Sequence, residues 1–97
     1  RYLTSDEWVE RVREAGWKAT TCPVDLSSPD ATLEEYERAA KTADIMIAEV
    51  GAWSNPISPN AEESKAAIEK CKRALYVADK LDAGCAVTIA GSRGTLW

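Results

Sequence analysis

The chain has 97 residues with a net charge of −4, and 45% of its residues are hydrophobic. A chain of this length folds into at most one domain with a modest core, and an acidic balance without a basic stripe excludes nucleic acid as a partner. No apolar run approaches the roughly 20 residues that a membrane helix needs, and no signal segment opens the chain, so we expect a soluble protein with no membrane partner.

Cysteine spacing and the lack of histidine argue against two kinds of site. Cys22, Cys71 and Cys85 lie far apart without a CxxC motif, and the chain contains no histidine. Neither a zinc site nor a disulfide scaffold fits this pattern. We therefore expect reduced thiols and a cytoplasmic location. Because the chain begins with Arg1 instead of methionine, we also expect it to be a piece of a longer protein.

Two short helices are predicted in the first half of the chain. The first is expected to start within Thr4-Ser5-Asp6-Glu7, where a hydroxyl can accept a hydrogen bond from an orphan backbone N–H and the acids suit the helix dipole. Gly16 is the natural residue at its end. The second is expected to begin at Thr32, where Thr32 and Glu35 match a capping box, and to end near Ala43.

A third and longer helix is predicted after the Pro-rich segment that follows. Ser58 is its expected cap and Pro59 its first helical residue, and it runs to Leu81. Its apolar stripe is expected to contain Ala67, Ile68, Cys71, Ala74, Leu75, Ala78 and Leu81.

Three strands are predicted, over residues 17–22, 45–50 and 85–90, and each follows a helix. Such alternation implies an α/β fold with parallel strands joined by helical crossovers. Side-chain alternation places Ile45, Ile47 and Glu49 on one face of the second strand and Met46, Ala48 and Val50 on the other. A carboxylate on the face away from the helices suggests a barrel lumen or a ligand crevice.

The end of the second strand carries the first candidate binding residues: Glu49, Trp53 and Asn55. Ligands of α/β sheets bind at the carboxyl ends of the strands. Glu49 could accept hydrogen bonds from sugar hydroxyls or be held by a threonine or arginine of a neighbouring strand. Trp53 could form a wall against a sugar ring or pack against the rest of the fold. Asn55 could bind a hydroxyl, although Asn-Pro is also common turn chemistry, which we favour.

The exit loop of the third strand, residues 91–94, supplies two more candidates, Ser92 and Arg93. Glycines expose backbone N–H groups and arginine binds phosphate or carboxylate with two hydrogen bonds, so this loop could hold an anion. Alternatively, Arg93 could pair with an acid such as Glu49 across the strand ends.

Three segments together resemble the sugar phosphate isomerase/epimerase family. They are AEVGAWSNPISPN at residues 48–60, CKRALYVADKL at 71–81 and CAVTIAGSRG at 85–94. That family has the xylose isomerase-like TIM barrel, a (β/α)8 fold shared with the AP endonuclease family 2 enzymes. The resemblance implies that residues 1–97 form a single partial barrel domain, from about the first helix to the fourth strand.

In that family a divalent metal (Mn, Mg or Co) is held by two Glu, one Asp and one His of later strands, and the two glutamates move a proton between adjacent sugar carbons. The resemblance therefore implies that the full-length parent protein binds a sugar. It also implies that this chain contains no catalytic residue and no metal ligand, and that the chain alone has no activity. Our candidates for substrate binding in this chain remain the residues at the strand ends: Glu49, Trp53, Asn55, Ser92 and Arg93.

A second interpretation is a small α/β assembly module without catalytic activity. Three strands make an incomplete sheet, and unpaired sheet edges favour association. On either interpretation we expect a homo-oligomer, in which copies complete the sheet.

Overall fold

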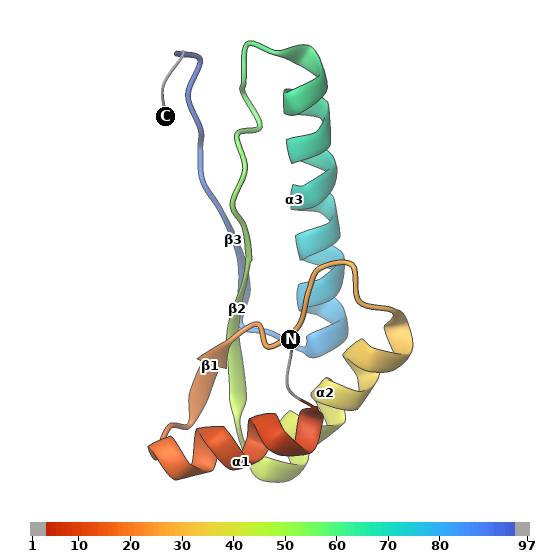
Figure 1. The fold of residues 1–97 in the computed structure, drawn as a ribbon, viewed down its shortest axis with the longest axis vertical. Coiled ribbons are helices and arrows are strands. Elements are labelled where there is room, and N and C mark those ends of the chain that lie inside the picture. The colour runs from red at the N-terminus through yellow and green to blue at the C-terminus, as the bar shows by residue number, and fades with distance from the viewer. Residues whose placement is uncertain (1–3, 95–97) are drawn as a thin grey trace.

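Helices and strands alternate along the part of the chain that the structure, a computed structural model, describes, residues 4–94. The order is α1 (Ser5–Ala15), β1 (Ala19–Thr21), α2 (Asp30–Ala43), β2 (Met46–Ala52), α3 (Ala61–Leu81) and β3 (Cys85–Thr88). The strands form one sheet in the order β1-β2-β3, and both pairs are parallel (Figure 1). The predicted α/β fold of three parallel strands alternating with helices is confirmed.

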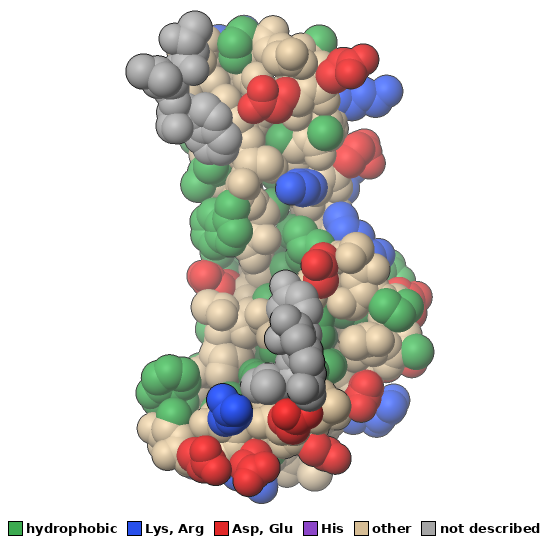
Figure 2. Space-filling view, in the orientation of Figure 1, with side chains coloured by type: hydrophobic (Ala, Val, Ile, Leu, Met, Phe, Trp, Pro, Cys, Tyr) green, Lys and Arg blue, Asp and Glu red, His purple; other side chains and the backbone are tan. Residues whose placement is uncertain are grey.

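Among residues 4–94, the helices leave one side of the sheet uncovered. Helix α3 lies along β2 and β3, whereas α2 and α1 lie at the foot of the molecule, with α1 packed against α2 (Figure 1). Charged side chains are spread over the visible surface, with acids gathered over α1 (Figure 2). Within residues 4–94, no helix is long and apolar enough to cross a membrane.

Helix α1 has the boundaries that its sequence predicts. The Thr4 hydroxyl accepts a hydrogen bond from the Glu7 N–H, and the Glu7 carboxylate accepts one from the Thr4 N–H, so the two residues form a capping box. The helix ends at Gly16, which has a φ of 76°, a left-handed conformation that glycine adopts without steric cost.

Helix α2 begins three residues before the predicted position, because its cap is Pro29 instead of Thr32. Its first residue is Asp30 and its cap is Pro29, which makes no side-chain hydrogen bond. The Thr32 N–H already donates to the Pro29 carbonyl, so the predicted capping box at Thr32 and Glu35 is wrong. The Asp30 carboxylate favours the earlier start because it lies at the positive end of the helix dipole and accepts a hydrogen bond from the Tyr76 hydroxyl of α3 at 2.8 Å.

Helix α3 begins later than predicted, after Asn60 instead of Ser58. The Asn60 side-chain oxygen accepts hydrogen bonds from the N–H groups of Glu62 and Glu63, both at 3.0 Å. The Ser58 hydroxyl instead accepts from the Asn60 N–H at 3.2 Å, which shapes the turn before the helix. Asparagine and serine cap helices about equally well, so the residue types alone did not show which of the two is the cap of α3.

A β-bulge in β2 overturns the predicted side-chain alternation. Thr20 of β1 lies opposite Ile47, but the next residue, Thr21, lies opposite Glu49. Ala48 is therefore an extra residue, and an extra residue reverses the faces of all residues after it. Consequently Val50 joins Ile47 on the buried, helix-covered side, whereas Glu49 lies on the opposite, uncovered side.

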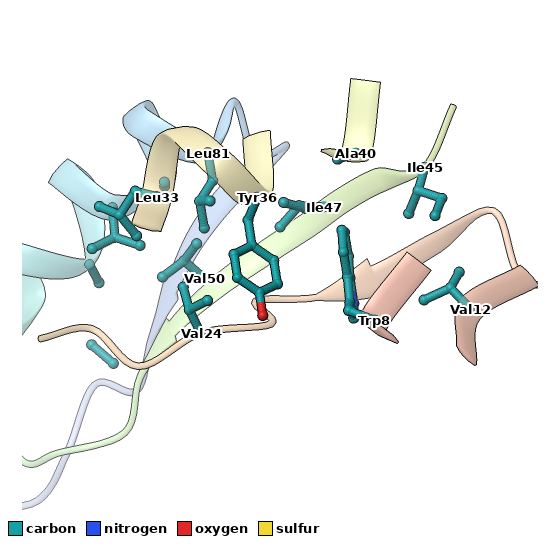
Figure 3. Packing of buried hydrophobic residues seen from close by; sticks show 14 residues of the cluster. Trp8, Val12, Val24, Leu33, Tyr36, Ala40, Ile45, Ile47, Val50 and Leu81 are labelled. Atoms are coloured by element: carbon teal, nitrogen blue, oxygen red, sulfur yellow. The ribbon is translucent and has the colours of Figure 1, made fainter. Parts of the chain in front are cut away.

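The core lies between the helices and the covered side of the sheet (Figure 3). Leu33 and Tyr36 of α2 point toward Ile47 and Val50 of β2, and the rings of Trp8 and Tyr36 meet with centroids 5.6 Å apart (Figure 3).

Helix α3 contributes a narrower stripe to this core than predicted: Ala67, Ala74, Val77, Ala78 and Leu81. Ile68 and Leu75, which were expected to widen that stripe, are 42% and 64% exposed. They lie on the flank of α3 away from α2, where no described helix packs.

Arg73 of α3 holds the loop between β1 and α2 in place by hydrogen bonds. Its guanidinium donates hydrogen bonds to the carbonyls of Leu26 at 2.6 Å and Ser28 at 2.7 Å, and it lies 4.9 Å from the Tyr76 ring centroid. Carbonyl groups of an irregular loop need partners, and one side chain here supplies two of them.

Replacing Arg73 with Met should lower the free energy of unfolding by about 1.5–3 kcal/mol, because charge-assisted hydrogen bonds are lost while the aliphatic stem is kept. Urea unfolding followed by circular dichroism measures the change. Lys72→Met is the matched control, since Lys72 is exposed on the same helix and should alter stability by less than about 0.5 kcal/mol. Equal stability of the two variants would contradict the role assigned to Arg73.

Candidate functional site

An open pocket of about 450 Å³ lies at the carboxyl ends of β1 and β2. Its lining comes from the end of β1 and the loop after it, from β2 and from α3: Thr21, Cys22, Val24, Asp25, Leu26, Glu49, Val50, Gly51, Trp53 and Lys70. Its volume falls within the range of small-molecule sites. Two of the predicted binding residues, Glu49 and Trp53, are therefore brought together in this pocket.

Glu49 lies on the uncovered side of the sheet, half-buried beside the end of β1. Within residues 4–94, no threonine or arginine makes a hydrogen bond or ion pair with its carboxylate, although Thr21 lies opposite it in the sheet. The alternative in which a threonine or arginine of a neighbouring strand holds Glu49 is therefore not observed. Its oxygens are available to hydroxyl groups that enter the pocket.

Asp25 is a second carboxylate in the pocket lining. The Ser27 N–H and hydroxyl donate to it at 3.0 and 2.9 Å, and these hydrogen bonds, together with the more distant charge of Lys70, lower the pKa of Asp25. The group therefore stays ionised well below neutral pH. With Glu49 and Lys70, the lining presents two acidic residues and one basic residue.

Trp53 lies against the backbone of Gly51, on the same side of the strand as Glu49. A side chain at position 51 would overlap the indole ring, so only glycine lets the ring lie this close to the strand. The rest of the ring faces outward, since Trp53 is 62% exposed. An aromatic face held in this way can stack on an apolar ligand surface.

Cys22 borders the pocket as a protonated thiol. Burial is the main cause that raises its pKa, and the nearby Asp25 carboxylate adds to the effect; the Sγ donates to the Val24 carbonyl at 3.2 Å. Thiolate, not thiol, is the nucleophile. Cys22 therefore lacks the activation that covalent catalysis requires.

Asn55, Ser92 and Arg93 do not line this pocket. The Asn55 side chain is 2% exposed; its Nδ2 donates to the Ser92 carbonyl at 2.7 Å and its Oδ1 accepts from the Ser92 N–H at 2.9 Å. Asn55 thereby joins the segments that follow β2 and β3, and its amide is not available to a ligand. Arg93 is exposed, and among residues 4–94 it forms no ion pair with Glu49.

Two charged residues of the pocket, Asp25 and Lys70, were not among the candidates from the sequence. A signal existed for Asp25, because it follows the end of β1, and parallel strands end at the same edge of a sheet. Lys70 carried no such signal, since it lies on the side of α3 and reaches the pocket only through helix packing.

The described residues bring no three His, Cys, Asp or Glu side chains together as ligands for a metal ion. The site thus consists of two carboxylates, an ammonium group, an aromatic face and a threonine hydroxyl. Comparison with models of known protein families, with curated proteins and with solved structures found no match for this chain.

Proposed function

We propose that this chain is an arc of a (β/α)8 barrel of a metal-dependent sugar isomerase or epimerase, and that its pocket forms part of the sugar-binding wall. The observation that carries the proposal is the pairing of Glu49 with Trp53 in one pocket at the carboxyl ends of the strands, where barrel enzymes bind their substrates. The family resemblance of residues 48–60 and 85–94 supplies the reaction class.

The chemistry of the lining suits a polyhydroxylated ligand. Glu49 and Asp25 accept hydrogen bonds from hydroxyl groups, the Lys70 ammonium donates to them, and the Trp53 ring covers the apolar C–H face of a sugar. Because acids outnumber bases in the lining, a phosphate group would be repelled here. We therefore assign this pocket to the uncharged part of the sugar.

In this proposal the chain binds and orients the sugar but moves no proton. The metal chemistry of the family requires a ligand set that the described residues do not assemble. The proposal gives this chain no catalytic step and assigns the proton transfer to residues of the parent enzyme outside it.

Titration of the chain with D-fructose, followed by ¹⁵N NMR, tests the proposal. The expected result is a shift of the signals of Glu49, Gly51 and the Trp53 indole. Trp53→Ala and Glu49→Gln should each weaken binding by about tenfold or more, the effect of losing one charge-assisted or stacking contact.

Trp17→Ala is the matched control, because Trp17 is 65% exposed and lies outside the pocket. The proposal fails if no signal in the pocket moves, or if Trp17→Ala and Trp53→Ala weaken binding equally. Epimerisation of the ketose by the isolated chain with Mn²⁺ would contradict the assignment of the proton transfer to other residues.

A further inference from the structure

Helices α1 and α2 enclose an open groove of about 800 Å³, here called the α1–α2 groove. Its apolar part is formed by Val9, Ala39 and Ala43. Asp6, Glu10 and Glu14 line α1 at four-residue spacing and therefore form one row along that helix. Glu35, Arg13 and Arg38 complete the charged lining, so four acids face two arginines. The groove is thus an apolar channel with a predominantly acidic rim.

Helix α3 carries the complementary feature, here called the α3 ridge: Lys65, Ile68, Lys72 and Leu75. Their spacing of three and four residues puts them on one side of the helix. The buried side chains of α3, among them Ala74 and Val77, lie on the opposite side of the helix, and Arg73 holds the loop before α2 through the Ser28 carbonyl. Tyr76, one turn after Lys72, borders the ridge and contacts Asp30 of α2. The ridge is therefore turned away from the buried side of α3, and it exposes Ile68 between the two lysines and Leu75 one turn beyond Lys72.

We propose that the α3 ridge of one copy of this chain docks into the α1–α2 groove of a second copy. Ile68 and Leu75 would cover the apolar channel, which removes both from water and supplies the affinity. Lys65 and Lys72 would lie against the acidic row of α1, which selects the orientation and speeds the encounter. Lys72 lies 3.3 Å from Glu69 in the same helix, an exposed pair that competes weakly.

This contact is heterologous, because ridge and groove are different surfaces of one chain. Such contacts leave a free ridge and a free groove at the ends of each dimer, so association continues into a closed ring or an open filament. The proposal is independent of the sugar pocket, and it uses helices where the sequence predicted association through the open sheet.

Two charge-reversed proteins test the contact by sedimentation velocity over a concentration series. The ridge variant is Lys65→Glu/Lys72→Glu, and the groove variant is Glu10→Lys/Glu14→Lys; all four side chains are exposed, so both proteins should fold. Each variant alone should self-associate about tenfold or more weakly than the natural chain, since like charges then face each other. An equimolar mixture should regain association, because every ridge then meets a groove of opposite charge.

Lys18→Glu, an exposed reversal outside both surfaces, is the control and should associate like the natural chain. Added salt should weaken association of the natural chain and of the mixture alike. The proposal is overturned if the natural chain stays monomeric at every concentration, which would leave the groove to a different protein. It is also overturned if either variant associates normally, or if mixing restores nothing.

Discussion

Replacing Leu33 with Ala is expected to lower the free energy of unfolding by about 2–5 kcal/mol, the usual cost of removing a large buried side chain. Leu33 is 0% exposed and lies where α2 meets β2, among the largest fully buried side chains of residues 4–94. A domain of this size has a total stability of only about 5–15 kcal/mol. The variant should therefore lose much of its free energy of unfolding, and it should unfold at a markedly lower urea concentration.

Leu75→Ala is the control for this prediction, because it makes the same chemical change at a position that is 64% exposed. It should change stability by less than about 0.5 kcal/mol when measured at low protein concentration, where self-association does not contribute. Urea titrations monitored by tryptophan fluorescence compare the two variants. If both variants unfold at the same urea concentration, Leu33 is not the centre of the core described above.

Replacing Asn55 with Ala is expected to destabilise the chain by about 2–5 kcal/mol. The change leaves the N–H and the carbonyl of Ser92 without their partner, and each unsatisfied buried group costs about 1–3 kcal/mol. Gly91 adds to the constraint: its φ is 89°, and any side chain there would overlap the Asn55 amide. Hydrogen exchange should show early loss of protection at Ser92 and Gly94.

Ser58→Ala tests whether this effect is specific to the buried amide. Ser58 lies in the same loop, and its hydroxyl accepts one exposed hydrogen bond from the Asn60 N–H, so its loss should cost less than about 1 kcal/mol. Protection at Ser92 that is unchanged in Asn55→Ala would contradict the joining role of Asn55.

The candidate site illustrates how far local sequence signals extend. Trp53 could be singled out because it follows an apolar strand, and Glu49 because it is the acid near the end of the strand predicted over residues 45–50; parallel strands end together at one edge. The observed β2 runs on to Ala52, so Glu49 lies within it. Asn55 follows the same strand but makes its contacts with Ser92, 37 positions further along. No local sequence pattern relates residues that far apart in the chain, so the structural role of Asn55 became evident only from the fold.

The sequence by itself determined the kinds of element and their order, because burial on one side imposes a period of 3.6 on helices and 2 on strands. It also determined the start of α1 to within a few residues and its end at Gly16, because the hydrogen-bond partners at both ends lie within one turn. Only the tertiary structure decided that Ile47 and Glu49 lie on opposite sides of the sheet, because the bulge at Ala48 arises from pairing with β1. It likewise decided that Leu75 stays exposed, since the period of a helix shows an apolar side but not whether another element covers it.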